Sequence, residues 1–417
     1  MKKFRVTINE RAGIYKRIDL TPDQLVPIKF NQIKINDADT DIFLVNMDYD
    51  TTLMIGRDEV SLIKRWLRNP PDIEEINTNQ EFIQTLLDSD FIQESGGTSL
   101  FSRSIRPRPQ LYGNWLAWLK PFIFPIIIIQ VVIILFALFV YIPNYQRLTP
   151  SIRDFFWTDD IFTLYTVSFV ISYILVFIHE LGHFFASKAY GIESRINIFS
   201  TRVNQLVAET EHYFAFSIKK SHRINMYLMG ILVDATIASL VLLALAFNVI
   251  PIEFIPIAKF VFLCQILGVL WQFNVFYKTD VYNTLCEWLG QENLYEDSLR
   301  YLQLKMRKYK PFRKMLPIFL KFLKTDDFSE RFSDLTPTQK RNAKLFSVLF
   351  ILGITQSFII MAFISIPRDL ILIQKAISEI LVVGNPINLA KTVVVVAAIS
   401  WTYLVLLVIT IRKFAFK

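Results

Sequence analysis

The sequence has few of the residues that shape small secreted or water-soluble proteins. Its 417 residues include only two cysteines, which excludes a disulfide framework and a cysteine-rich metal site. Charged residues make up 20% of the chain, below the roughly 25% that is usual in soluble domains. The first residues, Met-Lys-Lys-Phe, are not followed by the apolar run of a secretory signal peptide. A small disulfide-rich protein and an ordinary soluble enzyme are therefore both excluded.

Apolar side chains, by contrast, are abundant. Hydrophobic residues account for 53% of the chain, and 37 of its residues are phenylalanine. An apolar run of about 20 residues is long enough to cross a bilayer as a helix. Six such runs lie at 121–142, 161–187, 225–250, 254–277, 345–366 and 390–411. The sequence therefore predicts a mainly α-helical, multi-pass integral membrane protein with about six transmembrane helices.

The positive charge is unevenly distributed. The net charge is +8, and fourteen lysines and arginines lie in segment 278–344. Cytoplasmic loops of membrane proteins carry such an excess, so we expect this segment and both termini on the cytoplasmic side. The setting that fits is a bacterial cytoplasmic membrane. Because the orientation accounts for the charge, no nucleic-acid partner is expected.

The amino-terminal part differs from the rest. Residues 1–93 predict a small cytoplasmic α/β domain of winged-helix-like type, with strands at 42–47 and 52–55. A helix is expected at 58–67, and a second one after a capping box at 78–81. The other predicted parts are a linker at 94–112, a membrane core at 113–285, a basic cytoplasmic segment at 286–344 and a carboxyl-terminal transmembrane pair at 345–417.

One short motif carries a chemical meaning. His179 and His183 stand four residues apart, so on a helix they share a face and can bind one zinc ion together. Glu180 projects beside them, where it can act as general base on a zinc-bound water. The motif follows the apolar run 171–178, and ionisable groups within a membrane are functional by default. The motif therefore predicts a zinc metallopeptidase with a Zn²⁺ cofactor.

A zinc motif on an apolar helix resembles the site-2 protease family of intramembrane zinc metalloproteases. In that family a later membrane segment supplies an aspartate as third ligand, within an Asn-Pro…Asp-Gly pattern. Here Asn274 and Asp280 have the matching spacing, while Val275 and Val281 replace the family's proline and glycine. The resemblance implies that Asp280 is the third ligand and that the turn before it has its own geometry.

Other residues compete for the third ligand position. Glu209, Glu211 and His212 lie in the charged segment after the motif. Asp234 lies inside the third apolar run. As an alternative to a ligand, Asp234 is expected to orient one of the zinc-binding histidines through a hydrogen bond.

Two further features suggest contact with a peptide. Segments 194–199 and 202–208 alternate polar and apolar residues, which predicts a hairpin at the membrane surface. Its edge would hold an extended substrate by strand addition, or the hairpin would only cover the helices. Asn274 would bind the substrate backbone or a developing oxyanion, or would cap the turn before Asp280.

The closest resemblance is to a branch of peptide zinc metalloproteases in which a PqqD-like leader-binding domain precedes the membrane core. It implies that residues 1–93 hold a leader peptide, and that the enzyme cuts a small ribosomally made peptide during maturation or export. One alternative is regulated intramembrane proteolysis of a transmembrane regulator. Another is a zinc-binding membrane or immunity protein without turnover. The expected partners are the peptide substrate and the lipid bilayer.

Overall fold

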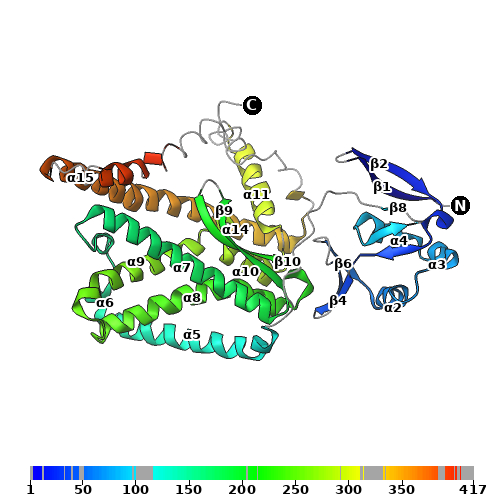
Figure 1. Cartoon of the computed structure of the whole chain (residues 1–417), viewed down its shortest axis with the longest axis horizontal. Coiled ribbons are helices and arrows are strands. Elements are labelled where there is room, and N and C mark those ends of the chain that lie inside the picture. The colour runs from blue at the N-terminus through cyan, green and yellow to red at the C-terminus, as the bar shows by residue number, and fades with distance from the viewer. Residues whose placement is uncertain are drawn as a thin grey trace. The chain divides into compact units, whose positions relative to one another are not determined.

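The chain divides into two compact units in a computed structural model (Figure 1). The first unit comprises Met1–Lys120, Ser187–Arg195 and Glu211–Arg223, and the second comprises Pro121–Ala186, Ile196–Thr210 and Ile224–Lys417. The structure describes residues 3–11, 14–31, 33–38, 41–46, 51–95, 98–99, 116–202, 205–213, 215–291, 293–309, 313, 332–333, 335–383, 390–398, 400–401 and 404.

The first unit combines short antiparallel sheets with short helices. Strands β1 (Phe4–Arg11) and β2 (Ile14–Leu20) form a hairpin. One three-stranded sheet has the order β3 (Ile28–Phe30), β7 (Ile92–Ser95), β8 (Thr98–Ser99), and the other has the order β4 (Ile33–Ala38), β5 (Asp41–Asn46), β6 (Thr51–Ile55). The helices are α1 (Pro22–Leu25), α2 (Arg57–Trp66), α3 (Ile73–Thr78) and α4 (Gln80–Asp88).

An apolar core holds these elements together. Ile63 and Trp66 from α2 are buried with Ile83 and Leu86 from α4, at the helical spacing of three residues in each case. Full burial of each such side chain stabilises the fold by roughly 1.5–3 kcal/mol. The indole of Trp66 also donates a 3.1 Å hydrogen bond to Glu75. This part of the chain thus has the core of a water-soluble domain.

The predicted strands at 42–47 and 52–55 are confirmed as β5 and β6, and the first predicted helix is α2. The predicted capping box is wrong in detail. The Thr78 hydroxyl donates to the carbonyl of Glu74 within α3, and Asn79 is the N-cap of α4. Strand β7 extends past the predicted domain boundary at 93 into the predicted linker, because Ser95 pairs with Ile28 of β3. The rest of that linker, from 100 to 112, lies outside the described residues.

Long helices make up most of the remaining chain. They are α5 (Lys120–Tyr141), α7 (Ile161–Ala189), α8 (Lys220–Ala246), α9 (Ile255–Gln272), α10 (Asp280–Leu289), α11 (Leu294–Lys308), α14 (Pro337–Ile360) and α15 (Ile366–Val383). Five helical stretches are long and apolar enough to cross a membrane: Ala117–Leu148, Ile161–Ala189, Lys220–Ala246, Ile252–Gln272 and Pro337–Ser378. The mainly helical class and the membrane-type helices agree with the sequence prediction.

The first four predicted runs coincide with four of these stretches, but the fifth differs. Its helix does not end near 366. It continues from α14 through the π-helix Met361–Ser365 into α15, in which Pro367 is the second residue. A proline lacks the N–H that a regular α-turn requires, and a π-turn is a common way to accommodate such an interruption. The sixth run, 390–411, is described only in part: residues 390–398 are helical, and 405–411 lie outside the described residues.

Helix α7 is flanked by α8 and α9, and this arrangement positions the histidine motif. A Cβ atom at Gly182 would lie only 3.0 Å from Val233 and 3.2 Å from the carbonyl oxygen of Met229. The glycine therefore lets α7 and α8 approach closely. On the α9 side, Ser172 and Cys264 lie 3.9 Å apart, oxygen to sulfur. The predicted hairpin is confirmed as β9 (Glu193–Arg202) and β10 (Gln205–Tyr213), which follow α7.

Candidate metal centre

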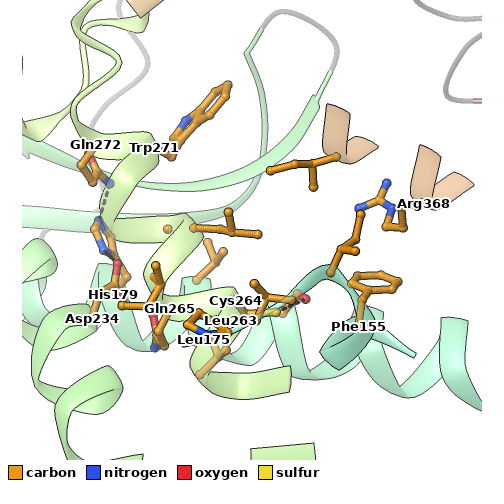
Figure 2. A pocket seen from close by; sticks show the side chains of 18 of the residues that line it. Phe155, Leu175, His179, Asp234, Leu263, Cys264, Gln265, Trp271, Gln272 and Arg368 are labelled. Carbon is orange, nitrogen blue, oxygen red and sulfur yellow. Dashed lines mark hydrogen bonds and ion pairs between the residues drawn. The ribbon is translucent and has the colours of Figure 1, made fainter. Parts of the chain in front are cut away.

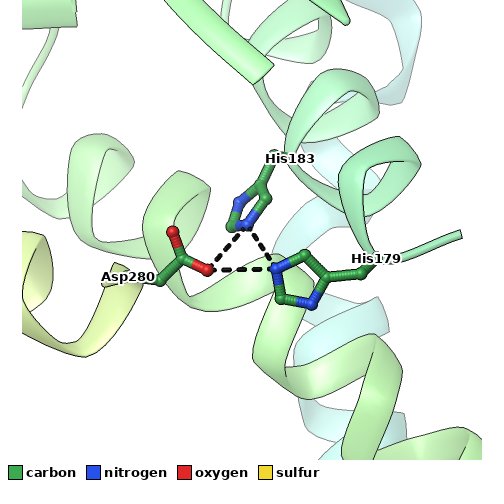
Figure 3. A group of neighbouring side chains, drawn as sticks. All are labelled: His179, His183 and Asp280. Carbon is green, nitrogen blue, oxygen red and sulfur yellow. Dashed lines mark hydrogen bonds and ion pairs between the residues drawn. The ribbon is translucent and has the colours of Figure 1, made fainter. Parts of the chain in front are cut away.

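Three side chains converge beside α7 (Figure 3). The Nε2 atoms of His179 and His183 lie 3.2 Å apart. The Asp280 Oδ2 atom lies 3.1 Å from the first and 3.0 Å from the second. Three ligand atoms of a tetrahedral zinc ion with bonds of about 2.0–2.1 Å stand about 3.3 Å apart. The triangle therefore has the size that one such ion requires.

The opposite ring nitrogens are already occupied. His179 Nδ1 lies 2.7 Å from Asp234 Oδ2, and His183 Nδ1 lies 2.8 Å from the carbonyl oxygen of Met226. Both acceptors belong to α8. Each of them requires a proton on Nδ1, which leaves the lone pair of the neutral imidazole on Nε2. Helix α8 thus directs both histidines to present Nε2 to the same point.

Gly230, also on α8, keeps space open at that point. A Cβ atom there would lie 2.3 Å from His183 Nε2 and 2.7 Å from His179 Nε2. Any larger residue would displace the imidazoles. The donor set, its spacing and this glycine together fit a bound metal ion, and His179, His183 and Asp280 would hold it.

Asp280 reaches the histidines because the chain turns sharply after α9. The turn contains the short helix η6 (Val275–Tyr277) and then Lys278, which adopts a left-handed φ of 52°. Asp280 is the first residue of α10, and its backbone N–H donates to the Gln272 side chain over 3.2 Å. To bind a metal ion, Asp280 must be a carboxylate and both imidazoles must be neutral.

Glu180 is held beside the histidine pair by a residue of β10. The hydroxyl of Thr210 lies 2.7 Å from Glu180 Oε2 and 3.1 Å from the Glu180 carbonyl oxygen. Glu180 is 8% exposed and lines a cavity that also contains His179 and Asp234. The carboxylate is thus oriented and has access to a space large enough for water and a ligand.

That cavity has a volume of about 740 Å³ (Figure 2). Residues of α7 and α9 form most of its wall, which is mainly apolar and includes Leu175, Val176 and Leu267. The Gln272 side chain lies at the metal end, with Nε2 3.4 Å from His179 Nε2. The arrangement joins a possible metal centre, a candidate base and an apolar ligand space.

Asn274 lies apart from this space. It is fully buried and does not line the cavity, and its amide donates to the hydroxyl of Ser357 on α14. A Cβ atom at Gly353 of α14 would lie 2.7 Å from Asn274 Oδ1. The described contacts of Asn274 therefore join the turn before Asp280 to α14, and the substrate-binding role stays a prediction.

Among the described residues, the group that can hold a metal contains Asp280 and none of its rivals from the sequence. Asp234 contacts a histidine from behind, as the alternative prediction requires. His212 Nδ1 lies 2.9 Å from the Ser187 hydroxyl, and Glu209 and Glu211 are partly buried in β10.

Sequence reasoning missed four contributors: the Met226 carbonyl, Thr210, Gly230 and Gln272. A backbone carbonyl leaves no signal in a sequence. Thr210 and Gly230 are common residue types in elements whose approach to α7 is set by packing. Gln272 carried a usable signal, because an uncharged polar residue at the end of an apolar run is costly in a membrane unless it has a role.

No protein-family model, curated protein or solved structure matches this chain.

Proposed function

We propose that this protein is a membrane-embedded zinc metallopeptidase. The observation that carries the proposal is the convergence of His179 Nε2, His183 Nε2 and Asp280 Oδ2 to within 3.2 Å of one another, with Glu180 next to them in a cavity. Two imidazoles and one carboxylate are a usual donor set for catalytic zinc, which keeps a further position open for water or substrate.

The chemistry follows from the positions of these groups. Bound zinc would supply Lewis-acid polarisation of the substrate carbonyl and of water. Glu180 takes a proton from the attacking water, and Thr210 keeps its carboxylate in place. The water oxygen joins the carbonyl carbon, the C–N bond breaks, and the proton on Glu180 passes to the departing amine. Gln272 has an amide at the same end of the cavity, where it can donate to the carbonyl oxygen of the bond that is cut.

The proposal also covers the side of the membrane at which the reaction takes place and the substrate. Six membrane crossings with cytoplasmic termini would put the metal centre toward the cytoplasmic side, in the manner of site-2 proteases. The substrate would be a small ribosomally made peptide during maturation or export. The amino-terminal unit would hold its leader, and this is supported by the predicted pair of strands, β5 and β6, which precede helices α2 to α4 as in the winged-helix-like, PqqD-like domain that we expect.

Metal analysis of the purified protein tests the proposal. We expect one zinc ion per chain in the wild type, and none after His179→Ala or Asp280→Ala, because two remaining protein ligands rarely retain zinc against a buffer. Glu211→Gln changes a rival carboxylate and should keep the metal. Zinc retained by Asp280→Ala and lost by Glu211→Gln would show that the third ligand has been assigned wrongly.

Activity is the second measurement. Mass spectrometry of apolar peptides incubated with the zinc-loaded protein should detect cleavage products. A protein that binds zinc stoichiometrically and cuts no peptide would contradict the proposed reaction and would favour a zinc-binding protein without turnover.

A further inference from the structure

Most of the cavity lies beyond the metal centre. Figure 2 shows His179, Asp234 and Gln272 at one end, Cys264 and Gln265 in the middle, and Phe155 with Arg368 at the other end. Water and a metal ion need only the first part. The total volume of about 740 Å³ falls in the range of about 300–1,000 Å³ that is typical of ligand sites. The remaining length therefore needs an occupant of its own.

Gln265 is the unusual residue of this wall. Its side chain is only 2% exposed, and among the described residues its Nε2 atom has no hydrogen-bond partner. A buried donor without an acceptor costs about 1–3 kcal/mol, and nothing in a lipid interior repays that cost. Gln265 lines the cavity, and a rotation of its terminal amide, whose nitrogen is itself enclosed, would bring this donor to an acceptor on a bound molecule.

Gln265 and Gln272 lie on one face of α9. They are seven residues apart, which is two helical turns or about 10.5 Å of rise. Gly268 lies between them and also lines the cavity. A Cβ atom at Gly268 would have only ordinary contacts, at 3.7 Å from Asp234 and 3.9 Å from Gln265. Two side-chain amides thus lie along a mainly apolar wall, with a glycine, which has no side chain, between them.

The rise between these two positions is that of a short extended peptide segment. An extended chain advances about 3.3–3.4 Å per residue, and its carbonyls point alternately to opposite sides. With the carbonyl of the bond that is cut next to Gln272, the carbonyls that face the same wall near Gln265 are therefore two or four residues away, about 7 or 13 Å along the chain. A lipid acyl chain would fit the apolar wall but offers no acceptor at that depth.

We propose that Gln265 is a substrate-binding residue that donates a hydrogen bond to a main-chain carbonyl two or four residues from the bond that is cut. The occupant of the cavity is an extended peptide segment with apolar side chains. The inference rests on the proposed peptidase function and adds to it the substrate class, the binding conformation and the length of the recognised segment.

The test measures binding without turnover, in the Glu180→Gln protein loaded with zinc in detergent. The probe is a fluorescein-labelled Leu/Ala/Gly octapeptide amide, and fluorescence anisotropy gives the dissociation constant. A set of matched probes carries a thioamide, a weaker acceptor than an amide, at one successive position each. At one position the thioamide should weaken binding about threefold to tenfold, the value of one neutral hydrogen bond.

Gln265→Met then removes the donor and keeps the side-chain length. In this variant the plain probe should bind about threefold to tenfold more weakly, and the thioamide should have no further effect. The matched control is Gln130→Met, which changes another buried glutamine, on α5, that does not line the cavity. It should bind both probes as the parent protein does.

Thiol labelling tests whether the bound peptide probe lies in the cavity. Cys264 lines the cavity and Cys286 does not, so Cys286→Ser leaves one reporter thiol. Bound peptide should slow the reaction of Cys264 with an apolar maleimide. Folding is checked by the thermal midpoint, which Gln265→Met should leave unchanged or raise, because it removes an unpaired buried amide.

The inference is overturned if no probe binds, if Cys264 stays unprotected, or if the thioamide effect persists in Gln265→Met. A cavity filled by lipid would produce the second outcome. The proposed function can fail separately. If the peptide binds with this dependence on Gln265 but the zinc-loaded wild type does not cleave it, the binding site is supported and the peptidase reaction is contradicted.

Discussion

The two units of the chain differ in the large apolar side chains that they expose to their surroundings. In the first unit the largest fully buried side chains are apolar, such as Trp66 and Ile63, and few large apolar side chains are exposed among the described residues. In the second unit Phe139 is 73% exposed on α5, whereas His179, Asp234 and Gln265 are buried. Water favours the first arrangement and lipid the second. The difference indicates two solvents for one chain, and it explains why the candidate metal centre lies in the interior of the helical unit.

The largest effect is expected at the buried base. Glu180→Gln keeps the size of the side chain and removes its ability to accept a proton. Peptide hydrolysis should fall about 10²–10⁴-fold, with the zinc content unchanged. The control Glu253→Gln changes an exposed glutamate in the short helix Ile252–Phe254 and should retain full activity. Loss of zinc in Glu180→Gln would mean that Glu180 is a ligand and not a base.

The comparison between the units is tested directly by two similarly exposed apolar residues. Val132 on α5 is 58% exposed and Met54 on β6 is 64% exposed. Val132→Asp should impair membrane insertion by about 3 kcal/mol, because the aspartate would face lipid. Met54→Asp should change stability by no more than about 0.5 kcal/mol, because it would face water. The measurement is the fraction of protein that resists carbonate extraction, together with the melting midpoint. Equal effects of the two substitutions would contradict the assignment of two solvents.

A buried polar partner behind a ligand is expected to matter less than the ligand itself. Asp234→Ala removes the acceptor of His179 Nδ1 and should weaken zinc binding about 10–100-fold. Asp234→Asn keeps an acceptor and should lose less. Competition with a chromogenic chelator gives both affinities. If Asp234→Ala binds zinc as the wild type does, α8 does not orient His179 in the way we infer.

Space at the metal centre can be tested with a pair of glycines. Gly230→Ala places a methyl group against both imidazoles and should lower zinc affinity by about 1–3 kcal/mol, as overpacking typically does. Gly268→Ala adds the same group where its contacts are ordinary and should leave zinc affinity unchanged. The same chelator assay measures both, and similar affinities of the two variants would show that Gly230 makes no room for an ion.

The smallest effect is expected from Thr210→Val. The substitution keeps the shape of the side chain and removes the hydrogen bond to the Glu180 carboxylate. The turnover number should fall about threefold to tenfold, with zinc affinity unchanged. A steady-state assay at saturating peptide measures the turnover number separately from substrate binding. A change in KM alone would mean that Thr210 contacts the substrate and does not position Glu180.

The sequence could predict features that depend on local periodicity. The apolar runs, the histidine pair and the hairpin after it are of this kind. The positions of Gly230, Thr210 and Gln265 became meaningful only through packing, since each acts on a residue of another helix or on a ligand space. The predicted end of the fifth run at 366 was wrong, because a π-turn lets the helix continue through Pro367. In the first unit most strands were missed, although β1 and β4 alternate apolar and polar residues as strands do.

The long separation between the ligands gives the metal centre an order of assembly. During synthesis His179 leaves the ribosome 101 residues before Asp280, and the Asp234 partner follows His179 after 55. At about 5–20 residues per second, the two histidines wait roughly 5–20 seconds for their third ligand. Helix α8 fixes the imidazoles during that interval, and the turn after α9 then completes the donor set. Metal uptake at the proposed site would therefore report that the membrane core has assembled, and a nascent chain that stops before this turn would lack the third of the three side chains.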